Sequence, residues 1–577
     1  MDLERLRRTE YNQQYIAAMR PVFNRRALFT DTSAEYVIPE EPEPYSEVTI
    51  RFRTARNNVD RIFLVSGGQK HLMVRVESNN DFDYYAYVMR LDDQKVSYYF
   101  EVQTGRITGI FDMRGLVQEV NEYYDFIIIP GFHTPDWAKG AVMYQIYTDR
   151  FCNGDPSNDV LTNEYCYIGE PVHRVEDWGR YPAQMDVREF YGGDLQGVLD
   201  KMDYLQELGV EVIYFNPLFV SPSNHKYDIQ DYDYIDPHYG KIVEDGGELL
   251  KDGVSDNRKA ERYINRVTNK KNLEASNRFF AELVEEIHAC GMKVILDGVF
   301  NHCGSFNKWL DREEIYQVSG DYEDGAFVSK DSPYRNFFGF QDQFAWPYNT
   351  TYEGWWGHDT LPKLNYEGSE KLMEDIMRIG AKWVSPPFNA DGWRLDVADE
   401  LPDDFVAGIH QAARAEKPGA LLIGEVWEDG SNKVAYGVRR KHILGGHCDG
   451  LMNYPCRNAL LSFRLGEDAF RFRQAMETLR ENYPPAAFYS AMNFLGTHDT
   501  PRILTLLGQA ALCCVLTAAR LGGLYAPFSL AAAAAAGPGL PGLLSLLGVT
   551  GGALLFLDFQ PGLRHAAAAV LLFAAQT

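Results

Sequence analysis

Two hydrophobic patterns divide the chain. In its first quarter, short runs rich in β-branched and aromatic residues alternate with turn signals such as Gly67-Gly68. The runs are VTIRFRT (48–54), RIFLVS (61–66), LMVRVES (72–78), YYAYVMRL (84–91) and VSYYFEV (96–102). Strands at this spacing predict an N-terminal β-sandwich, resembling a carbohydrate-binding module, over residues 1–135. The sandwich carries no evident catalytic cluster, so a packing or dimerisation role is the simplest interpretation.

From about residue 140, apolar runs alternate with amphipathic stretches of helical period. The apolar runs are AVMYQIY (141–147), EVIYFNPLF (211–219), MKVILDGVF (292–300), DGWRLDV (391–397), ALLIGEV (420–426), AMNFLGTHD (491–499) and the weaker DGLMNY (449–454). This alternation predicts βαβ units and a parallel sheet. Polar residues follow nearly every run, as at the mouth of a (β/α)8 TIM barrel, where the carboxyl ends of all strands converge. An α/β barrel over residues 136–508 is therefore favoured over an open doubly wound sheet.

Two long stretches interrupt the alternation. Residues 301–365 are rich in aromatic residues, Gly and Asn, and they are too long for an ordinary loop between a strand and a helix. We expect them to form a small inserted domain over the mouth of the barrel. Residues 236–276 are charged, and we expect a surface excursion there.

Composition narrows the class of protein. The chain has 577 residues and a formal net charge of −25, and so acidic a surface argues against nucleic-acid binding. The N-terminus lacks the apolar run of a secretory signal. The 8 Cys residues include no C-x-x-C pair, which argues against a zinc site or a disulfide framework. These features predict a cytoplasmic protein.

The last part of the chain, residues 509–577, has an anomalous Ala/Leu/Gly-rich composition. Its charged residues are Arg520, Asp558 and Arg564. A shifted reading frame or chimeric assembly is the favoured explanation. A membrane anchor at 541–557 is disfavoured, because the apolar run falls short of the roughly 20 residues needed to span a bilayer and contains Gly and Pro. An unusual replacement for the last strand is the third explanation; without one, the barrel is incomplete and its first and seventh strands keep unpaired edges.

Chemistry-bearing side chains follow consecutive predicted strands. They are Asp297 with Asn301 and His302, Arg394 with Asp396, Glu425, and His498 with Asp499. Cleavage of an acetal needs one carboxylate at the cationic sugar carbon and one protonated carboxyl at the leaving oxygen. Any one of these residues alone is more commonly a cap, a core residue or a structural ion pair. The joint pattern is far more specific, and it predicts a glycosidase.

Strand alternation predicts two of the roles. Arg394 and Asp396 are two residues apart and therefore share a face of their strand, so Arg394 is expected to favour the ionised form of Asp396. Glu425, crowded by Asp396 and Asp499, is expected to hold the proton that a general acid needs.

The motifs DGVFNH, GWRLDVADE, GEVW and FLGTHD resemble the four ordered signature regions of the α-amylase superfamily, glycoside hydrolase family 13. LPKLN (361–365) resembles a further signature of its neopullulanase, cyclomaltodextrinase and maltogenic amylase branch. The resemblance covers residues 1–508 and implies a retaining hydrolase of α-glucans. It implies Asp396 as nucleophile, Glu425 as general acid/base and Asp499 as the residue that grips and distorts the sugar. It also implies that Arg394, His302 and His498 bind hydroxyls, that Tyr227 forms a stacking platform and that Asp297 supports the site.

Two further features bear on substrate choice. The stretch Val397-Ala398-Asp399-Glu400 differs by one residue from the VANE-type sequence that in this branch accompanies cleavage of both α-1,4 and α-1,6 links, which makes dual specificity a weaker expectation. Five aromatic or imidazole side chains crowd the inserted stretch, and two of them, with Trp356 as the chosen candidate, are expected to face the glucan. The five are Trp346, Tyr348, Trp355, Trp356 and His358.

The segment NGDPSND (153–159) offers hard oxygen ligands around a tight turn. On spacing alone, a polar turn with capping side chains is slightly favoured over a Ca²⁺ site. The resemblance reverses that preference and implies one structural calcium. Its implied ligands are Asn153, Asp155, Asn158, Asp159, Gly192 and Asp194.

The sequence thus predicts a two-step glycosidase acting on maltodextrins, cyclodextrins or pullulan, with a second sugar able to replace water. The alternatives are an α-glucosidase or amylopullulanase-type enzyme, and an inactive glucan-binding relative that lost the end of its barrel. The expected partners are α-glucan oligosaccharides, and no membrane association is expected. A homodimer in which the sandwich covers the partner's site is a further hypothesis.

Overall fold

A computed structural model describes residue 8 and residues 22–183, 186–340, 352–507 and 529–534. The chain divides into two compact units. The first contains the residues up to His133 together with 443–445 and 474–488, and the second contains the rest.

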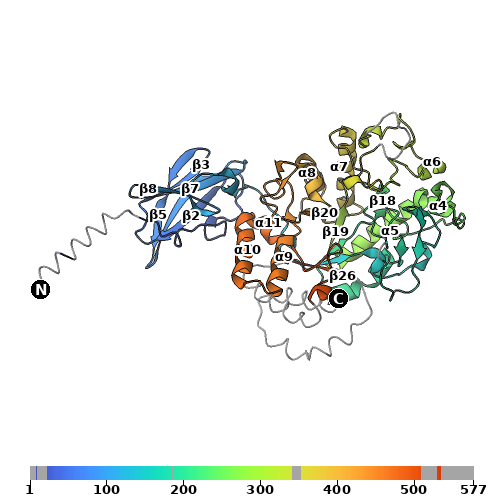
Figure 1. The fold of residues 1–577 in the computed structure, drawn as a ribbon, viewed down its shortest axis with the longest axis horizontal. Helices are drawn as coiled ribbons and strands as arrows, with labels where there is room; N and C mark the ends of the chain where they lie inside the picture. The colour runs from blue at the N-terminus through green and yellow to red at the C-terminus, as the bar shows by residue number, and fades with distance from the viewer. Residues whose placement is uncertain (1–7, 9–21, 184–185, 341–351, 508–528, 535–577) are drawn as a thin grey trace, which may run out of the picture. The chain divides into compact units, whose positions relative to one another are not determined.

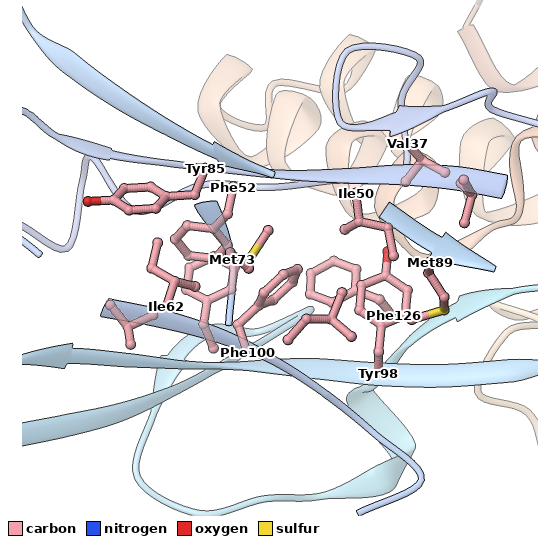
Figure 2. Close-up of a cluster of buried hydrophobic side chains, with 14 of the residues drawn as sticks. Val37, Ile50, Phe52, Ile62, Met73, Tyr85, Met89, Tyr98, Phe100 and Phe126 are labelled. Atoms are coloured by element: carbon pink, nitrogen blue, oxygen red, sulfur yellow. The ribbon is translucent and has the colours of Figure 1, made fainter. Parts of the chain in front are cut away.

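The first unit is an antiparallel β-sandwich (Figure 1). One sheet has the order β1 (Val37–Ile38), β2 (Glu47–Ala55), β6 (Phe82–Arg90), β5 (Val74–Ser78). The other has the order β4 (Gln69–Leu72), β3 (Arg61–Ser66), β7 (Val96–Thr104), β8 (Ile107–Asp112), β9 (Gly115–Val117), with β10 (Phe126–Ile128) paired to β7. Alternate residues of β2 and β7 fill the space between the sheets, and Phe52 meets Phe100 there with ring centroids 4.8 Å apart (Figure 2). The predicted sandwich is confirmed.

One predicted strand of the sandwich is divided between the two sheets. The run 72–78 breaks at Met73, so that β4 pairs with β3 whereas β5 pairs with β6. Met73 is 3% exposed and lies in the core between the sheets (Figure 2). Burial of this side chain marks the point where the chain crosses from one sheet to the other.

The second unit is built on a parallel sheet of eight strands. Their order in space is β24 (Gly450–Leu451), β21 (Leu421–Gly424), β20 (Gly392–Leu395), β19 (Lys293–Gly298), β16 (Val212–Phe215), β11 (Met143–Ile146), β26 (Ser529–Ala534), β25 (Met492–Asn493). Strands β11, β16, β20 and β21 are buried along their whole length, as expected for a parallel sheet covered on both faces. A parallel bridge between Met452 and Met492 links the two strands at the ends of this order.

The position between β11 and β25, for which the sequence offered no clear strand, is taken by Ser529–Ala534. Backbone pairing requires no particular side chains, so the Ala-rich segment SLAAAA satisfies the N–H and C=O groups that both neighbouring strands present. The rest of the segment 509–577 lies outside the described residues.

Helices alternate with these strands. They are α2 (Leu195–Asp200), α3 (Met202–Glu207), α4 (Glu261–Thr268), α5 (Lys270–Ala289), α7 (Glu370–Val384), α8 (Asp403–Glu416) and α9 (Tyr454–Arg464). The expectation of a surface excursion over 236–276 is wrong for its second half, because α4 is amphipathic and fully buries Tyr263 and Val267. Within the described residues, no helix is long and apolar enough to cross a membrane, and the candidate segment 541–557 lies outside them.

A long irregular segment joins β19 to α7. It contains the short helices α6 (Ile315–Ser319), η6 (Arg335–Phe337) and η8 (Trp355–Gly357). Two of the five candidate sugar-contacting residues, Trp346 and Tyr348, fall outside the described residues. The segment returns to the end of β19 through an antiparallel bridge between His302 and Lys363.

Candidate active site

Arg394 organises a cluster of buried carboxyl groups at the carboxyl ends of β19, β20 and β21. Its Nη1 donates to Asp297 Oδ1 at 2.9 Å and to Asp396 Oδ1 at 2.9 Å. Its Nη2 lies 2.7 Å from Glu425 Oε2. Arg394 is 0% exposed, so one fully buried guanidinium faces three carboxyl groups that come from separate segments of the chain.

Neighbouring strands hold Asp297 and Asp396 in register. Asp297 is the Cα partner of Arg394 in the β19–β20 ladder, and the Asp396 N–H donates to the Gly298 carbonyl. Asp297 Oδ2 also accepts the hydroxyls of Tyr214 at 2.6 Å and Tyr227 at 2.8 Å. Asp297 therefore accepts hydrogen bonds from three side chains, which hold its carboxyl group in place.

Glu425 follows β21, and its carboxyl group accepts hydrogen bonds from one backbone N–H and one side chain. The Val397 N–H donates to Oε2 at 2.8 Å, and the Trp427 indole N–H donates to Oε1 at 3.1 Å. Val397 has a positive φ of 40°, a strained conformation for a β-branched residue. The turn after Asp396 thus directs a backbone donor at the neighbouring carboxyl group.

Several groups act on the ionisation of Asp396. Burial, together with the charges of Glu425 and the other nearby carboxylates, raises the pKa of Asp396 well above its ordinary value, against the lowering effect of Arg394. The lowering effect of Arg394 agrees with the expectation from the sequence, which did not include the raising effects. With a single guanidinium among several buried carboxyl groups, negative charge is in excess, so the cluster favours retention of a proton.

Asp499 and His498 lie at the same site. His498 Nδ1 lies 2.9 Å from Gln145 Nε2, which also donates to Asn216 Oδ1 at 2.7 Å. The His498 ring stacks on Tyr227 with centroids 5.4 Å apart, and its Nε2 lies 3.3 Å from Asp499 Oδ1. Burial lowers the pKa of His498 to about 4, and desolvation raises the pKa of Asp499. The imidazole is therefore neutral near pH 7.

His302 connects the site to the inserted segment. It is 1% exposed, and burial lowers its pKa to about 4. The ring stacks on Trp355 with centroids 4.8 Å apart, and Trp355 in turn lies 4.9 Å from the ring of Trp356. Trp356 is 76% exposed, which leaves its indole accessible to a sugar. His358 is also exposed.

The candidate calcium segment forms a tight turn before α2. Of its predicted ligands, Asn153 and Asn158 each bury a side-chain oxygen that meets no hydrogen-bond donor in the described part of the chain. Asp159 Oδ1 accepts from Asn153 Nδ2 at 2.8 Å, and Asp159 Oδ2 pairs with Arg174 at 2.7 Å. Gly192 has a φ of 80°, and a Cβ there would lie 2.5 Å from Asp159 Oδ1. Unpartnered buried amide oxygens beside a carboxylate are the donor set that a hard cation prefers.

Two further predicted metal ligands, in addition to Asp159, already have other partners. Asp194 caps α2, accepting from the N–H groups of Gly197 at 2.6 Å and Gly154 at 3.0 Å. Asp155 pairs with Lys241 at 3.1 Å. Among the described residues, no three His, Cys, Asp or Glu side chains are grouped to hold a metal. The fit to calcium therefore rests on Asn153, Asn158 and Asp159.

Several residues of the site were not predicted from the sequence. Gln145 holds His498, Tyr214 holds Asp297, and Trp427 holds Glu425. Gln145 is the single polar residue of β11, and an isolated polar residue in an apolar strand is a signal that could have been used. Trp427 lies two residues after Glu425, beyond the end of β21 at Gly424, and this spacing was available from the motif GEVW.

Comparison with known families matches both units. The family described as alpha amylase, catalytic domain matches residues 145–255 and 275–521. The family described as alpha amylase, N-terminal ig-like domain matches residues 24–130.

Several characterised proteins are similar in sequence. A cyclomaltodextrinase of Thermoanaerobacter pseudethanolicus is 30% identical over 507 residues, which cover 84% of this chain and 74% of that protein. Neopullulanase 2 of Thermoactinomyces vulgaris is 30% identical over 502 residues, covering 84% and 73%. An amylopullulanase of Thermoanaerobacterium saccharolyticum is 33% identical over 487 residues, covering 76% of this chain but only 34% of that protein. This chain therefore spans about a third of the amylopullulanase.

Solved structures show the same fold. A cyclomaltodextrinase superposes with a TM-score of 0.59 at 24% identity and covers 96% of this chain and 85% of its own. The protein Ttha1563 from Thermus thermophilus superposes with a TM-score of 0.52 at 28% identity, covering 76% and 81%. The first of these comparisons bears on the fold alone.

Proposed function

This chain belongs to the α-amylase family, and we propose that it is a glycoside hydrolase of the neopullulanase and cyclomaltodextrinase type. It would cleave α-1,4-glucosidic bonds with retention, with Asp396 as nucleophile and Glu425 as general acid/base. The observation that carries the proposal is the Arg394 bridge. Its two terminal nitrogens contact Asp396 Oδ1 and Glu425 Oε2, which brings two carboxyl groups from different strands to one guanidinium. Acetal cleavage in two steps requires two nearby carboxyl groups, one as nucleophile and one as general acid/base.

In the first step, Asp396 attacks the anomeric carbon while Glu425 gives its proton to the leaving oxygen. The bond to the leaving sugar breaks as the ester with Asp396 forms. In the second step, Glu425 takes a proton from water, and the water oxygen displaces Asp396. A second sugar in place of water gives transglycosylation.

The proton must lie on Glu425 when the first step begins. Positive charge develops at the sugar carbon as the first step proceeds, and the carboxylate of Asp396 stabilises that charge. Asp297, fixed by two tyrosine hydroxyls, would keep Arg394 in place during this transfer.

The remaining site residues would bind the sugar. We assign Asp499 to the sugar hydroxyls and to ring distortion, with neutral His302 and His498 as further hydrogen-bonding groups. Tyr227 would stack on the sugar at the cleaved bond. Trp356 would contact a more distant part of the glucan, since its indole is exposed.

The substrate class follows from the relatives only as a proposal. The relatives are named cyclomaltodextrinase, neopullulanase and amylopullulanase. These names support cyclodextrins, maltodextrins or pullulan as the substrates of this chain, and cleavage of α-1,6 bonds as a second activity. An eight-stranded barrel as the catalytic architecture is supported by the strand order and by the bridge between Met452 and Met492. The homodimer and the cytoplasmic location stay predictions.

We also propose one structural calcium. Asn153, Asn158 and Asp159 would hold it, and the ion would stabilise the turn before α2 without taking part in the chemistry.

The test is release of reducing sugar from cyclodextrin and pullulan by the full chain. The wild type should hydrolyse at least one of them, and Asp396→Asn should lower kcat by roughly 10⁴-fold while binding remains measurable. The matched control is Asp252→Asn, which changes an exposed aspartate and should leave the rate unchanged. Equal hydrolysis by wild type and Asp396→Asn would overturn the assignment.

A further inference from the structure

A short β-hairpin stands on the loop that follows Glu425. It consists of β22 (Val434–Ala435) and β23 (Val438–Arg439), with Tyr436 and Gly437 at the turn. We call residues 434–439 the rim hairpin. Three of its apolar side chains are exposed: Val434 by 53%, Tyr436 by 75% and Val438 by 56%.

Polar contacts attach this loop to the turn that follows Asp396. Lys433 lies 2.9 Å from Asp399 Oδ2, and His442 Nε2 lies 3.2 Å from Asp399 Oδ1. The hydroxyl of Tyr436 donates to Glu400 Oε2 at 2.5 Å. The segment after the nucleophile and the segment after the acid are thus joined directly.

The same contacts give a role to Asp399, the residue that departs from the VANE-type sequence. Burial opposes its ionisation, but the hydrogen bonds from His442 and Lys433 hold the pKa of Asp399 below its ordinary value. An ionised Asp399 keeps the base of the rim hairpin in place.

Tyr436 is an unusual residue for the backbone conformation of this turn. Tyr436 and Gly437 have φ values of 52° and 78°. Two consecutive residues with positive φ in a two-residue hairpin favour Asn-Gly or Asp-Gly, because a large side chain is disfavoured at the first position. An exposed aromatic ring in this strained position is not required by the turn, and strained residues of this kind concentrate at functional sites.

We propose that Tyr436 is a sugar-binding residue on the leaving-group side of the site, where it holds the departing sugar and then the acceptor sugar in transglycosylation. The inference rests on the proposed function. The general acid must face the leaving oxygen, and the rim hairpin rises from the loop that follows Glu425. The flat ring offers an apolar surface to a glucose unit, and the bond to Glu400 fixes its orientation.

The acceptor step follows from this position. The acceptor hydroxyl oxygen bonds to the anomeric carbon as the bond to Asp396 breaks, and Glu425 takes the hydroxyl proton. An acceptor held by Tyr436 competes with water for the glycosyl group. Removal of the ring should therefore favour hydrolysis over transfer.

The experiment uses α-maltosyl fluoride as donor, because its leaving group places no sugar on that side, and maltose as acceptor. For Tyr436→Ala, the maltose concentration that gives half-maximal transfer should rise about fivefold. Hydrolysis of the donor without maltose should stay within about twofold of wild type. Tyr436→Phe, which keeps the ring and loses the bond to Glu400, should raise that concentration by about twofold.

Tyr45 provides a matched control in the β-sandwich. It is 65% exposed, it has a φ of 60°, and its hydroxyl donates to Asp93 at 2.9 Å. Tyr45→Ala should change neither rate. The proposal is overturned if Tyr436→Ala leaves transfer unchanged, or if it lowers transfer and donor hydrolysis equally, as a purely structural role would. A wild type that does not hydrolyse the donor would instead overturn the proposed function.

Discussion

Nη1 of Arg394 lies 2.9 Å from Oδ1 of Asp396, two residues further along the chain. The contact is buried, and the same guanidinium also faces Asp297 and Glu425. Arg394 is therefore the single described cation in direct contact with these three acidic groups, and both the stability and the ionisation of the cluster depend on it.

Replacement of Arg394 by Met should destabilise the protein strongly. It would leave three buried carboxyl groups without their cation, and breaking such a network costs about 3–5 kcal/mol. Urea unfolding followed by circular dichroism at pH 7 measures the loss. The control is Arg258→Met, whose pair with Asp256 is half-exposed, so that its loss should change the free energy of unfolding little. Equal losses for the two variants would contradict a central role of Arg394.

Replacement of Asp297 by Asn should move the pH profile of the enzyme. Burial raises the pKa of Asp396, and the charges of Glu425, Asp297 and Asp499 raise it further. Removal of the Asp297 charge should therefore lower the pKa of Asp396. The nucleophile is then ionised at lower pH, so the acidic limb of kcat/KM should shift to lower pH. An unchanged acidic limb, or a shift to higher pH, would contradict this effect of Asp297.

Replacement of His302 by Gln should reduce the acid sensitivity of the fold. The pKa of His302 is lowered by burial from 6.5 to about 4 in the folded state. Between these values the unfolded chain binds a proton that the folded chain does not, so stability falls as pH is lowered from about 6.5 to 4. The slope of unfolding free energy against pH should lose up to about 1.4 kcal/mol per pH unit in the variant. Parallel slopes in wild type and variant would refute this account.

Calcium should raise the melting temperature through Asn153 and Asn158. An ion at 100 times its dissociation constant adds about 2.7 kcal/mol to stability. We expect EDTA to lower the Tm and added CaCl₂ to restore it, with little effect of MgCl₂, which prefers rigid octahedral sites. Asn153→Ala should remove the response. A Tm that changes with neither EDTA nor added calcium would rule out the calcium site.

Replacement of Gly192 by Ala should lower stability by a different route. The position combines a φ of 80° with a Cβ distance of 2.5 Å to Asp159 Oδ1. Left-handed backbone alone costs an alanine about 1–2 kcal/mol, and the contact adds to this. The control is Gly169→Ala, where φ is 75° and no atom lies within 4 Å of the added Cβ. Unfolding in urea should show a larger loss at Gly192 than at Gly169.

Local pattern was enough for much of this molecule. Alternating apolar residues in VTIRFRT predicted β2, because period two places every second side chain in the core. The same period placed Arg394 beside Asp396, and the structure confirms their contact. The motifs at successive strand ends also predicted correctly that Asp297, Arg394 and Glu425 meet, because parallel strands bring their carboxyl ends to one edge.

Other properties depended on distances that no local pattern carries. The sequence predicted the effect of Arg394 on the ionisation of Asp396, but not the opposing effects of burial and of several carboxyl groups from distant segments. Gln145 reaches His498 across 353 positions of sequence, so only the folded sheet reveals the pair. The strand formed by Ser529–Ala534 likewise depends on the open edges of β11 and β25 rather than on its own Ala-rich sequence. Hydrophobic period and sequence motifs relate residues that are near one another in the chain. The charge balance of the carboxyl cluster, the orientation of its side chains and the pairing of strands are decided only when distant segments pack together and exclude water.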